Sequence, residues 1–261
     1  MNNRTVNPKF RPGSKKRRKT RLIKVKDVLI GGDAPVSIQS MTNTDTRDIT
    51  ATIMQIKELV DHGCEIVRVA IPNKAAVKAF AEIRHLVPEV PLVADVHFDY
   101  RLAIEAIEAG ADKVRINPGN LGGLERLEPI VEKAKEYNVP IRVGVNGGSL
   151  EQDLLNRLGA TPEAAVRSVL RYTKAMEQMN FRDIVVSIKF SDTLRTIEAN
   201  RMLAEMTDYP LHLGITEAGT LFSSTVASSI GIGALLIDGI GDTIRVSITA
   251  DPVEEVKVAK E

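Results

Sequence analysis

Residues 91–117, PLVADVHFDYRLAIEAIEAGADKVRIN, decide the fold. The stretch opens with a short apolar run, PLVADV, and closes with another, KVRIN. Between them, RLAIEAIEAG places apolar residues three and four positions apart, as in an amphipathic helix, and ends in the glycine that often follows a helix. A strand, a helix and a second strand in so short a stretch predict a parallel βαβ unit.

The same unit repeats along the chain. Short runs rich in valine and isoleucine begin at Ser37, Glu65, Pro91, Lys113, Pro140, Asp183, Pro210 and Thr243. Helical patterns lie between the runs, and the wide interval after the fifth run has room for an additional short helix, SLEQDLLNRLG. Eight such units predict an α/β fold of the (β/α)8 TIM-barrel type. A doubly wound open sheet is the alternative, but the first run continues into SMTNTDT rather than into a glycine-rich dinucleotide turn.

Three further segments complete the predicted organisation. The stretch 23–38, IKVKDVLIGGDAPVSI, predicts an N-terminal hairpin. The last helical pattern, DPVEEVKVAKE, is short, so we expect an incomplete last helix and outer ring, as in a fragment or one half of a split protein. Residues 1–21 hold nine Lys or Arg and no acid, which leaves 26 basic against 34 acidic residues thereafter. We therefore expect a disordered basic arm over 1–21 and a substrate-binding barrel domain over 22–261.

Composition excludes several classes of protein. Cys64 is the single cysteine, so this chain can form neither an intrachain disulfide nor a cysteine-only metal site. No apolar run approaches the roughly 18 residues of a membrane span, and no secretion signal is present, so we expect a cytoplasmic protein without a membrane partner. The basic arm could serve a nucleic-acid-binding protein, but its one aromatic residue, Phe10, offers bases little to stack on, and we expect no nucleic-acid partner.

Polar residues on these strands share one direction, because alternate residues of a barrel strand face the interior. They are Arg68, Asp95 with His97, Arg115 with Asn117, Arg142 with Asn146, Ser187 with Lys189, His212 with Thr216, Glu217, and Arg245 with Ser247. All lie toward the carboxyl ends of their predicted strands, where barrel enzymes assemble their active sites. We therefore expect these side chains to meet at one mouth of the barrel.

Five of these candidates are cations, namely Arg68, Arg115, Arg142, Lys189 and Arg245. Converging buried cations need anionic partners, and an internal salt-bridge network with Asp95 and Glu217 is one interpretation. Two acids are few for five cations, and arginine suits bidentate phosphate recognition, so we favour a ligand with more than one phosphate. Backbone donors of the segments GITEAG and GIGDT are expected near that phosphate.

The histidines and acids of this set have two further interpretations. Asp95, His97, His212 and Glu217 could exchange protons with a bound substrate. They could also hold a metal ion, but no local spacing such as His-Glu-x-x-His supports this, and we predict no metal site.

Long motifs in these same strands resemble the 4-hydroxy-3-methylbut-2-enyl diphosphate synthase family, in its N-terminal barrel. The matching segments are QSMTNT, IVRVAIP, PLVADVHFDYR, RINPGN, IRVGVNGGSLE, LHLGITEAG and GIGDTIRVS, which together span nearly all of residues 20–257. The resemblance implies an oxidoreductase of isoprenoid biosynthesis by the non-mevalonate pathway, with 2-C-methyl-D-erythritol 2,4-cyclodiphosphate as its substrate.

The resemblance also implies roles for individual residues. The substrate diphosphate would be held by Arg115, Arg142, Asn146, Lys189, Arg245 and Ser247, with Asn117 and Ser187 beside them. The reacting end would be lined by Arg68, Asp95, His97, His212 and Glu217, and Glu217 would be a proton donor. We therefore expect Glu217, Asp95 and His97 to be the catalytic residues.

In the family that the chain resembles, a separate C-terminal domain carries a 4Fe-4S cluster, held by three cysteines and a glutamate. Ferredoxin or flavodoxin supplies the electrons, and the enzyme is a homodimer. Since an iron-sulfur cluster needs thiolates that this chain does not have, we expect the chain to bind no cluster and to be inactive without the cluster domain. The alternative enzyme hypothesis is a pterin-binding barrel resembling dihydropteroate synthase, which also binds a diphosphate.

Overall fold

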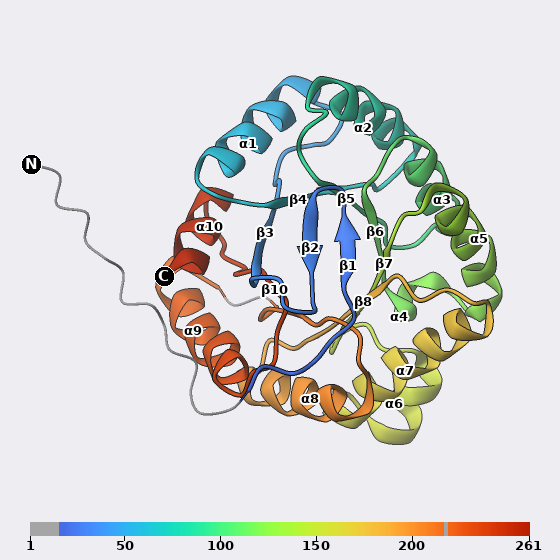
Figure 1. Ribbon diagram of the computed structural model, residues 1–261, viewed down its shortest axis with the longest axis vertical. Helices are drawn as coiled ribbons and strands as arrows, with labels where there is room; N and C mark the ends of the chain where they lie inside the picture. Colours follow the sequence, from blue (N-terminus) through green and yellow to red (C-terminus); the bar gives the residue numbers. More distant parts are fainter. Residues whose placement is uncertain (1–15, 217–218) are drawn as a thin grey trace, which may run out of the picture.

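A computed structural model of the chain describes residues 16–216 and 219–261 (Figure 1). Its main sheet contains eight parallel strands, β3 (Ser37–Met41), β4 (Ile66–Ala70), β5 (Leu92–Asp95), β6 (Lys113–Ile116), β7 (Ile141–Asn146), β8 (Ile184–Lys189), β9 (His212–Leu213) and β10 (Thr243–Ile244). They are hydrogen-bonded in the order β8-β7-β6-β5-β4-β3-β10-β9, and a parallel bridge between Val186 and Leu211 joins the two end strands. The predicted (β/α)8 barrel and its eight strands are therefore confirmed.

Helices surround this sheet (Figure 1). They are α1 (Ile49–Asp61), α2 (Lys74–Leu86), α3 (Tyr100–Glu108), α4 (Pro118–Leu121), α5 (Leu127–Tyr137), α6 (Gln152–Leu158), α7 (Pro162–Gln178), α8 (Thr193–Met206), α9 (Leu221–Ile237) and α10 (Pro252–Lys260), with a 3-10 turn at Leu124–Arg126. The additional helix predicted after the fifth strand is α6, whereas α4 and the 3-10 turn were not predicted. The sequence predicted a short last helix and an incomplete outer ring. In the structure this last helix is α10, which has nine residues and lies between α9 and α1 (Figure 1). No helix within 16–216 or 219–261 is long and apolar enough to span a membrane.

Aspartate side chains fix where several helices begin. Asp99 accepts a hydrogen bond from the backbone N–H of Arg101 at the start of α3, and Asp251 accepts one from Val253 at the start of α10. Such caps satisfy N–H groups that have no partner inside the helix and stabilise it by about 1 kcal/mol. These caps thus fix the residue at which each loop at the barrel mouth ends and its helix begins.

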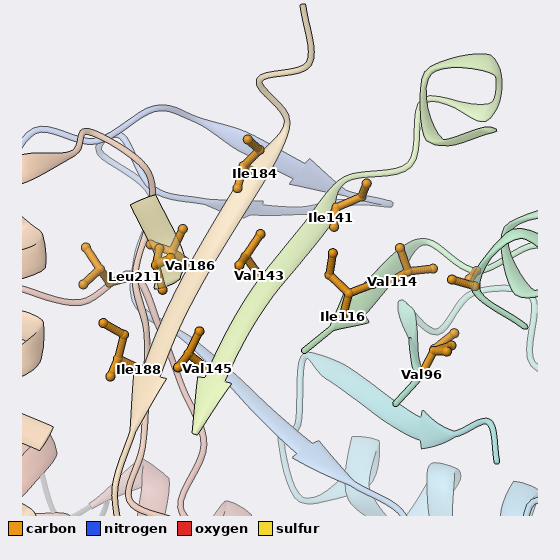
Figure 2. Packing of buried hydrophobic residues seen from close by; sticks show 14 of the residues in the cluster. Val96, Val114, Ile116, Ile141, Val143, Val145, Ile184, Val186, Ile188 and Leu211 are labelled. Carbon is orange, nitrogen blue, oxygen red and sulfur yellow. The ribbon is translucent and has the colours of Figure 1, made fainter. Parts of the chain in front are cut away.

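Alternation along the strands separates the apolar core from the polar interior. In β7, Ile141, Val143 and Val145 are fully buried and point to the helical side, and β8 does the same with Ile184, Val186 and Ile188 (Figure 2). The residues between them, such as Arg142 in β7, therefore face the inside of the barrel. TIM-barrel interiors are usually filled with branched apolar side chains, so polar residues at these positions indicate a functional role.

The N-terminal hairpin covers the end of the barrel formed by the amino ends of the strands. It consists of β1 (Ile23–Val25) and β2 (Val28–Ile30), which pair in antiparallel fashion as predicted. Val25 and Ile30 pack against Ile66 and Val93 at the amino ends of β4 and β5, and Figure 1 shows the hairpin lying across the centre of the ring. Among the described residues, the hairpin leaves the mouth at the carboxyl ends of the strands uncovered.

Basic residues at 16–21, which the sequence assigned to a disordered arm, bind to this closed end. The Arg17 guanidinium lies 3.0 Å from the Asp242 carboxylate, and Arg21 lies 2.8 Å from Asp208. Residues 1–15 lie outside the described part of the chain. Asp242 belongs to the segment GIGDT, which precedes β10 rather than following it, so the predicted contribution of GIGDT to a phosphate site at the mouth is wrong.

Candidate functional site

A small cavity of about 110 Å³ lies at the carboxyl ends of the barrel strands. It is lined by Arg68, Asp95, His97, Arg115, Arg142, Asn146, Ser187, Lys189, Ile215, Thr216, Arg245 and Ser247. All five predicted cations are among them, although they come from five different strands or strand ends. The structure thus brings the five basic side chains together around one cavity, and their role in binding a ligand stays a prediction.

Two described residues of the predicted site, Asn117 and His212, are not part of this lining. Asn117 donates a hydrogen bond to the Ser149 hydroxyl at 2.7 Å and accepts one from the Gly119 N–H, so it shapes the loop at the start of α4. His212 is buried behind Lys189 and does not reach the cavity. Glu217, the expected proton donor, lies outside the described residues.

Asp95 is the centre of one half of the site. Its carboxylate lies 3.4 Å from the Arg68 Nε and 3.3 Å from an Arg115 Nη, and the His97 Nε2 lies 3.4 Å away. Burial alone would raise the pKa of Asp95, but Arg68, the contact with His97 and then Arg115 hold it well below its usual value. Asp95 is therefore an anion at neutral pH, and it neutralises part of the charge of two arginines.

His97 has two competing partners at the edge of the cavity. Its Nε2 lies 3.4 Å from the Asp95 carboxylate and 3.1 Å from an Arg115 Nη. One ring nitrogen cannot donate to the carboxylate and accept from the guanidinium at once, so a proton shift on the ring exchanges these partners. This arrangement suits a group that moves a proton, and the ring is partly exposed toward the mouth.

The other half of the site has cations without carboxylate partners. Arg142 is 2% exposed, and its Nε and one Nη make no hydrogen bond with any described residue. Burial, and then Arg68 and Arg115, lower the pKa of Arg142, yet a guanidinium stays protonated in proteins. Lys189 is 8% exposed and contacts His212 instead of an acid. Neither of these two basic side chains has a carboxylate partner among the described residues.

Two glycines make room for the long basic side chains. A Cβ atom at Gly144 would lie 2.8 Å from the Arg115 Nε, and one at Gly214 would lie 2.6 Å from the Lys189 Nζ. Separations under about 3 Å force a neighbour to move, so any other residue at these positions would displace the cations. The glycines of β7 and of the segment after β9 therefore belong to the site, although they offer no side chain.

Glu255 is a site residue that the sequence analysis missed. It lies on α10, is 2% exposed, and accepts hydrogen bonds from the Arg245 Nε at 2.9 Å and Nη2 at 2.8 Å. The Ser40 hydroxyl donates a third bond to it at 2.8 Å. In the sequence, Glu255 is an acidic residue three positions after Pro252, on the buried face of a helix. That position can be identified only once it is known which face of the helix packs against the barrel.

Replacing Glu255 with glutamine is expected to lower the free energy of unfolding by about 3 kcal/mol, since Arg245, whose side chain is 14% exposed, would lose its paired charge. Urea denaturation checks this. The matched control is Glu254→Gln, because Glu254 pairs with Lys257 on the surface of the same helix, where such pairs contribute at most about 1 kcal/mol. Equal losses in the two variants would contradict a special role for Glu255.

Lys113 is a second polar residue that was missed. It precedes Arg115 by two positions and so faces the same interior, where it is fully buried with no hydrogen-bond partner among the described residues. Burial, followed by Arg142 and Arg68, lowers the pKa of Lys113 well below its ordinary value. The period-two rule that identified Arg115 could also have identified Lys113, which adds to the basic character beneath the cavity.

The described residues do not fit a metal or iron-sulfur centre. They contain no group of three or more His, Cys, Asp or Glu that could hold a metal ion. Cys64 is buried behind β3 and β4, and burial raises its pKa to about 12, so it is a poor thiolate ligand. The redox chemistry expected from the family resemblance therefore has no ligand set among these residues.

A larger hollow of about 650 Å³ lies outside the barrel, between α9 and α10. Its walls are mainly apolar, with Ile232, Leu236 and Val258 among them, and it holds none of the converging cations. We assign function to the smaller cavity, because convergent charged groups rather than size distinguish a reactive site.

Solved structures of other barrels share the fold. Dihydropteroate synthase from Xanthomonas albilineans superposes with a TM-score of 0.62 at 12% identity, covering 93% of this chain and 98% of that chain. The spore coat polysaccharide biosynthesis protein spsE from Bacillus subtilis gives a TM-score of 0.67 at 11% identity, covering 92% and 70%. At such low identities these likenesses show the barrel architecture alone.

Sequence relatives are far closer. Residues 20–260 match the model of the GcpE TIM-barrel domain family. A protein of Caldanaerobacter subterraneus subsp. tengcongensis named 4-hydroxy-3-methylbut-2-en-1-yl diphosphate synthase (flavodoxin) is 55% identical over 95% of this chain and 70% of its own length. One of the same name from Acidithiobacillus ferrooxidans is 56% identical over 93% of this chain and 66% of its own length. The chain therefore belongs to the GcpE TIM-barrel domain family, the family of the 4-hydroxy-3-methylbut-2-en-1-yl diphosphate synthases.

Proposed function

We propose that this chain is the substrate-binding barrel of a 4-hydroxy-3-methylbut-2-enyl diphosphate synthase and binds 2-C-methyl-D-erythritol 2,4-cyclodiphosphate at its mouth. One observation carries the proposal: five basic side chains line a single cavity whose described surroundings supply two carboxylates, Asp95 and Glu255. A diphosphate is the kind of ligand that supplies the missing negative charge. Membership of the synthase family supports the cyclodiphosphate as that ligand.

The two halves of the cavity suggest how the substrate lies. Arg142 and Lys189 have no carboxylate partner, so we assign them to the phosphate oxygens, together with Asn146, Ser187 and Ser247 beside them. The cluster of Arg68, Asp95, His97 and Arg115 already balances much of its own charge and suits the carbon end of the substrate. Of these residues, His97 is the one whose geometry allows a proton to move. Glu217 remains part of the proposal as a proton donor.

The redox partners are also part of the proposal. Relatives of the chain are named with flavodoxin, and we propose flavodoxin or ferredoxin as the electron donor of the complete enzyme. A 4Fe-4S cluster would supply the electrons for opening the ring, and its ligands would lie outside the described residues. We also propose that the protein is cytoplasmic and forms a homodimer. Analytical ultracentrifugation of the purified chain would test for the dimer.

Isothermal titration calorimetry tests the proposed substrate. We expect the cyclodiphosphate to bind with an affinity that falls as salt rises, because the contacts are ionic. A pterin diphosphate, the ligand of the dihydropteroate synthase hypothesis, serves as the comparison. Tighter binding of the pterin diphosphate would contradict the proposed function, as would failure of the cyclodiphosphate to bind at all.

A further inference from the structure

Lys189 and His212 form a buried pair of two basic side chains. The Lys189 Nζ lies 3.2 Å from the His212 Nε2, and the side chains come from the adjacent strands β8 and β9. His212 is fully buried and Lys189 is 8% exposed. Two nitrogen atoms at hydrogen-bond distance need one donor and one lone pair, so the pair can hold at most one positive charge.

The charged groups on other strands that act most strongly on the pair are all basic, and they oppose even that single charge. The groups are Arg142 on β7, Arg115 and Lys113 on β6, Arg68 on β4 and Arg245 after β10. The carboxylates described nearby, Asp95 and Glu255, are already bonded to arginines. Burial first, and Arg142 next, lower the pKa of Lys189 well below its ordinary value. For His212 the pKa is lowered by burial and then by Lys189.

We propose that Lys189 and His212 act as a proton store, which is uncharged in the empty site and takes up one proton when an anion binds. In the empty site the His212 Nε2–H donates to the lone pair of a neutral Lys189 amine. On binding, the Nε2–H bond breaks as a new N–H bond forms on Lys189, and the His212 Nδ1 takes up one proton from a buffer acid, which is left as its conjugate base. The lysine becomes an ammonium facing the anion, and the imidazole stays neutral.

The unpartnered Nδ1 of His212 supports this route. That nitrogen is buried and makes no hydrogen bond with a described residue, so nothing in the described structure fixes the ring in one tautomer. The proposal rests on the anion-binding function proposed above. It adds that anion binding depends on pH, because binding raises the pKa of Lys189. The affinity for the anion is therefore highest at low pH. Above the pKa that Lys189 has in the empty site, it falls by up to about tenfold per pH unit.

Inorganic sulfate is the probe, because it does not titrate near neutral pH and any proton exchanged comes from the protein or buffer. Calorimetry at pH 7.5 in two buffers with different ionisation enthalpies counts the protons. We expect about one proton taken up per sulfate bound. Nitrogen-15 spectra of histidine-labelled protein should show the His212 Nε2 losing its hydrogen as sulfate binds, with His212→Gln identifying the signal.

Lys189→Met should bind sulfate more weakly and take up no proton. Lys174→Met, which removes an exposed lysine of α7, should behave like the unchanged protein. Sulfate binding without proton uptake would overturn the proton store while leaving the anion site intact. If sulfate produced neither heat nor a spectral change, the anion site and the proton store would both be refuted.

Discussion

Replacing Arg142 with methionine is expected to weaken binding of the cyclodiphosphate by about 100-fold, or roughly 3 kcal/mol, without destabilising the empty barrel. Arg142 is 2% exposed and has two unpartnered nitrogen atoms, so in the proposed complex its hydrogen bonds go to the ligand. In the empty protein the same guanidinium is a buried charge among other cations. Methionine of similar length relieves that repulsion, and such replacements of buried charges are often neutral or stabilising.

Two measurements check this prediction together. Calorimetry gives the affinity of each variant, and urea denaturation without ligand gives its free energy of unfolding. The control is Arg167→Met, since Arg167 lies exposed on α7 and pairs with Glu163 at the surface. Arg142→Met should lose affinity and keep or gain stability, whereas the control should change neither by much. A variant that binds normally but unfolds more easily would show that Arg142 is a structural residue.

Replacing Asp95 with asparagine is expected to lower the free energy of unfolding at pH 7 by about 3–5 kcal/mol. The substitution preserves shape and removes the carboxylate that balances Arg68 and Arg115, which lie 3.4 and 3.3 Å away. Burial lowers the pKa of Arg68 to about 10, so the arginine stays charged at pH 7 and would be left unpaired. Asp61→Asn, at the exposed end of α1, is the matched control and should cost little.

The same aspartate predicts how stability responds to acid. The folded protein holds the pKa of Asp95 well below its unfolded value of about 4. Its contribution is therefore complete above pH 4 and is lost as the pH falls through the folded value. Denaturation curves between pH 7 and 3 should show Asp95→Asn losing its disadvantage toward the acid end. A constant difference across the whole range would contradict the assigned role.

The barrel and its ring of cations follow from one property of the sequence. Strands alternate between two faces, so polar residues two apart, such as Ser187 and Lys189 in β8, had to point inward once the barrel was recognised. The same rule places Lys113 on the inward face with Arg115, although our sequence analysis did not include Lys113 among the site residues. The alternation of residues along a strand therefore predicts which side of the sheet each residue faces.

The alternation rule does not predict how deep along the barrel axis each side chain lies. His212 is in phase with Thr216, yet Thr216 lines the cavity and His212 lies beneath it, because they stand at different heights. Asn117 has the right phase but follows its strand and serves as a helix cap instead. Glu255 could not be placed at all without the packing of α10 against β3. Pairings between distant segments depend on tertiary packing, which no local pattern records.

A crystal structure of this chain with bound 2-C-methyl-D-erythritol 2,4-cyclodiphosphate tests the central claim most directly. We predict phosphate oxygens within hydrogen-bond distance of Arg142 and Lys189, with Asp95 and Glu255 still bonded to their arginines. Ligand bound away from the barrel mouth, or Arg142 and Lys189 each paired with a carboxylate of the protein, would contradict the claim.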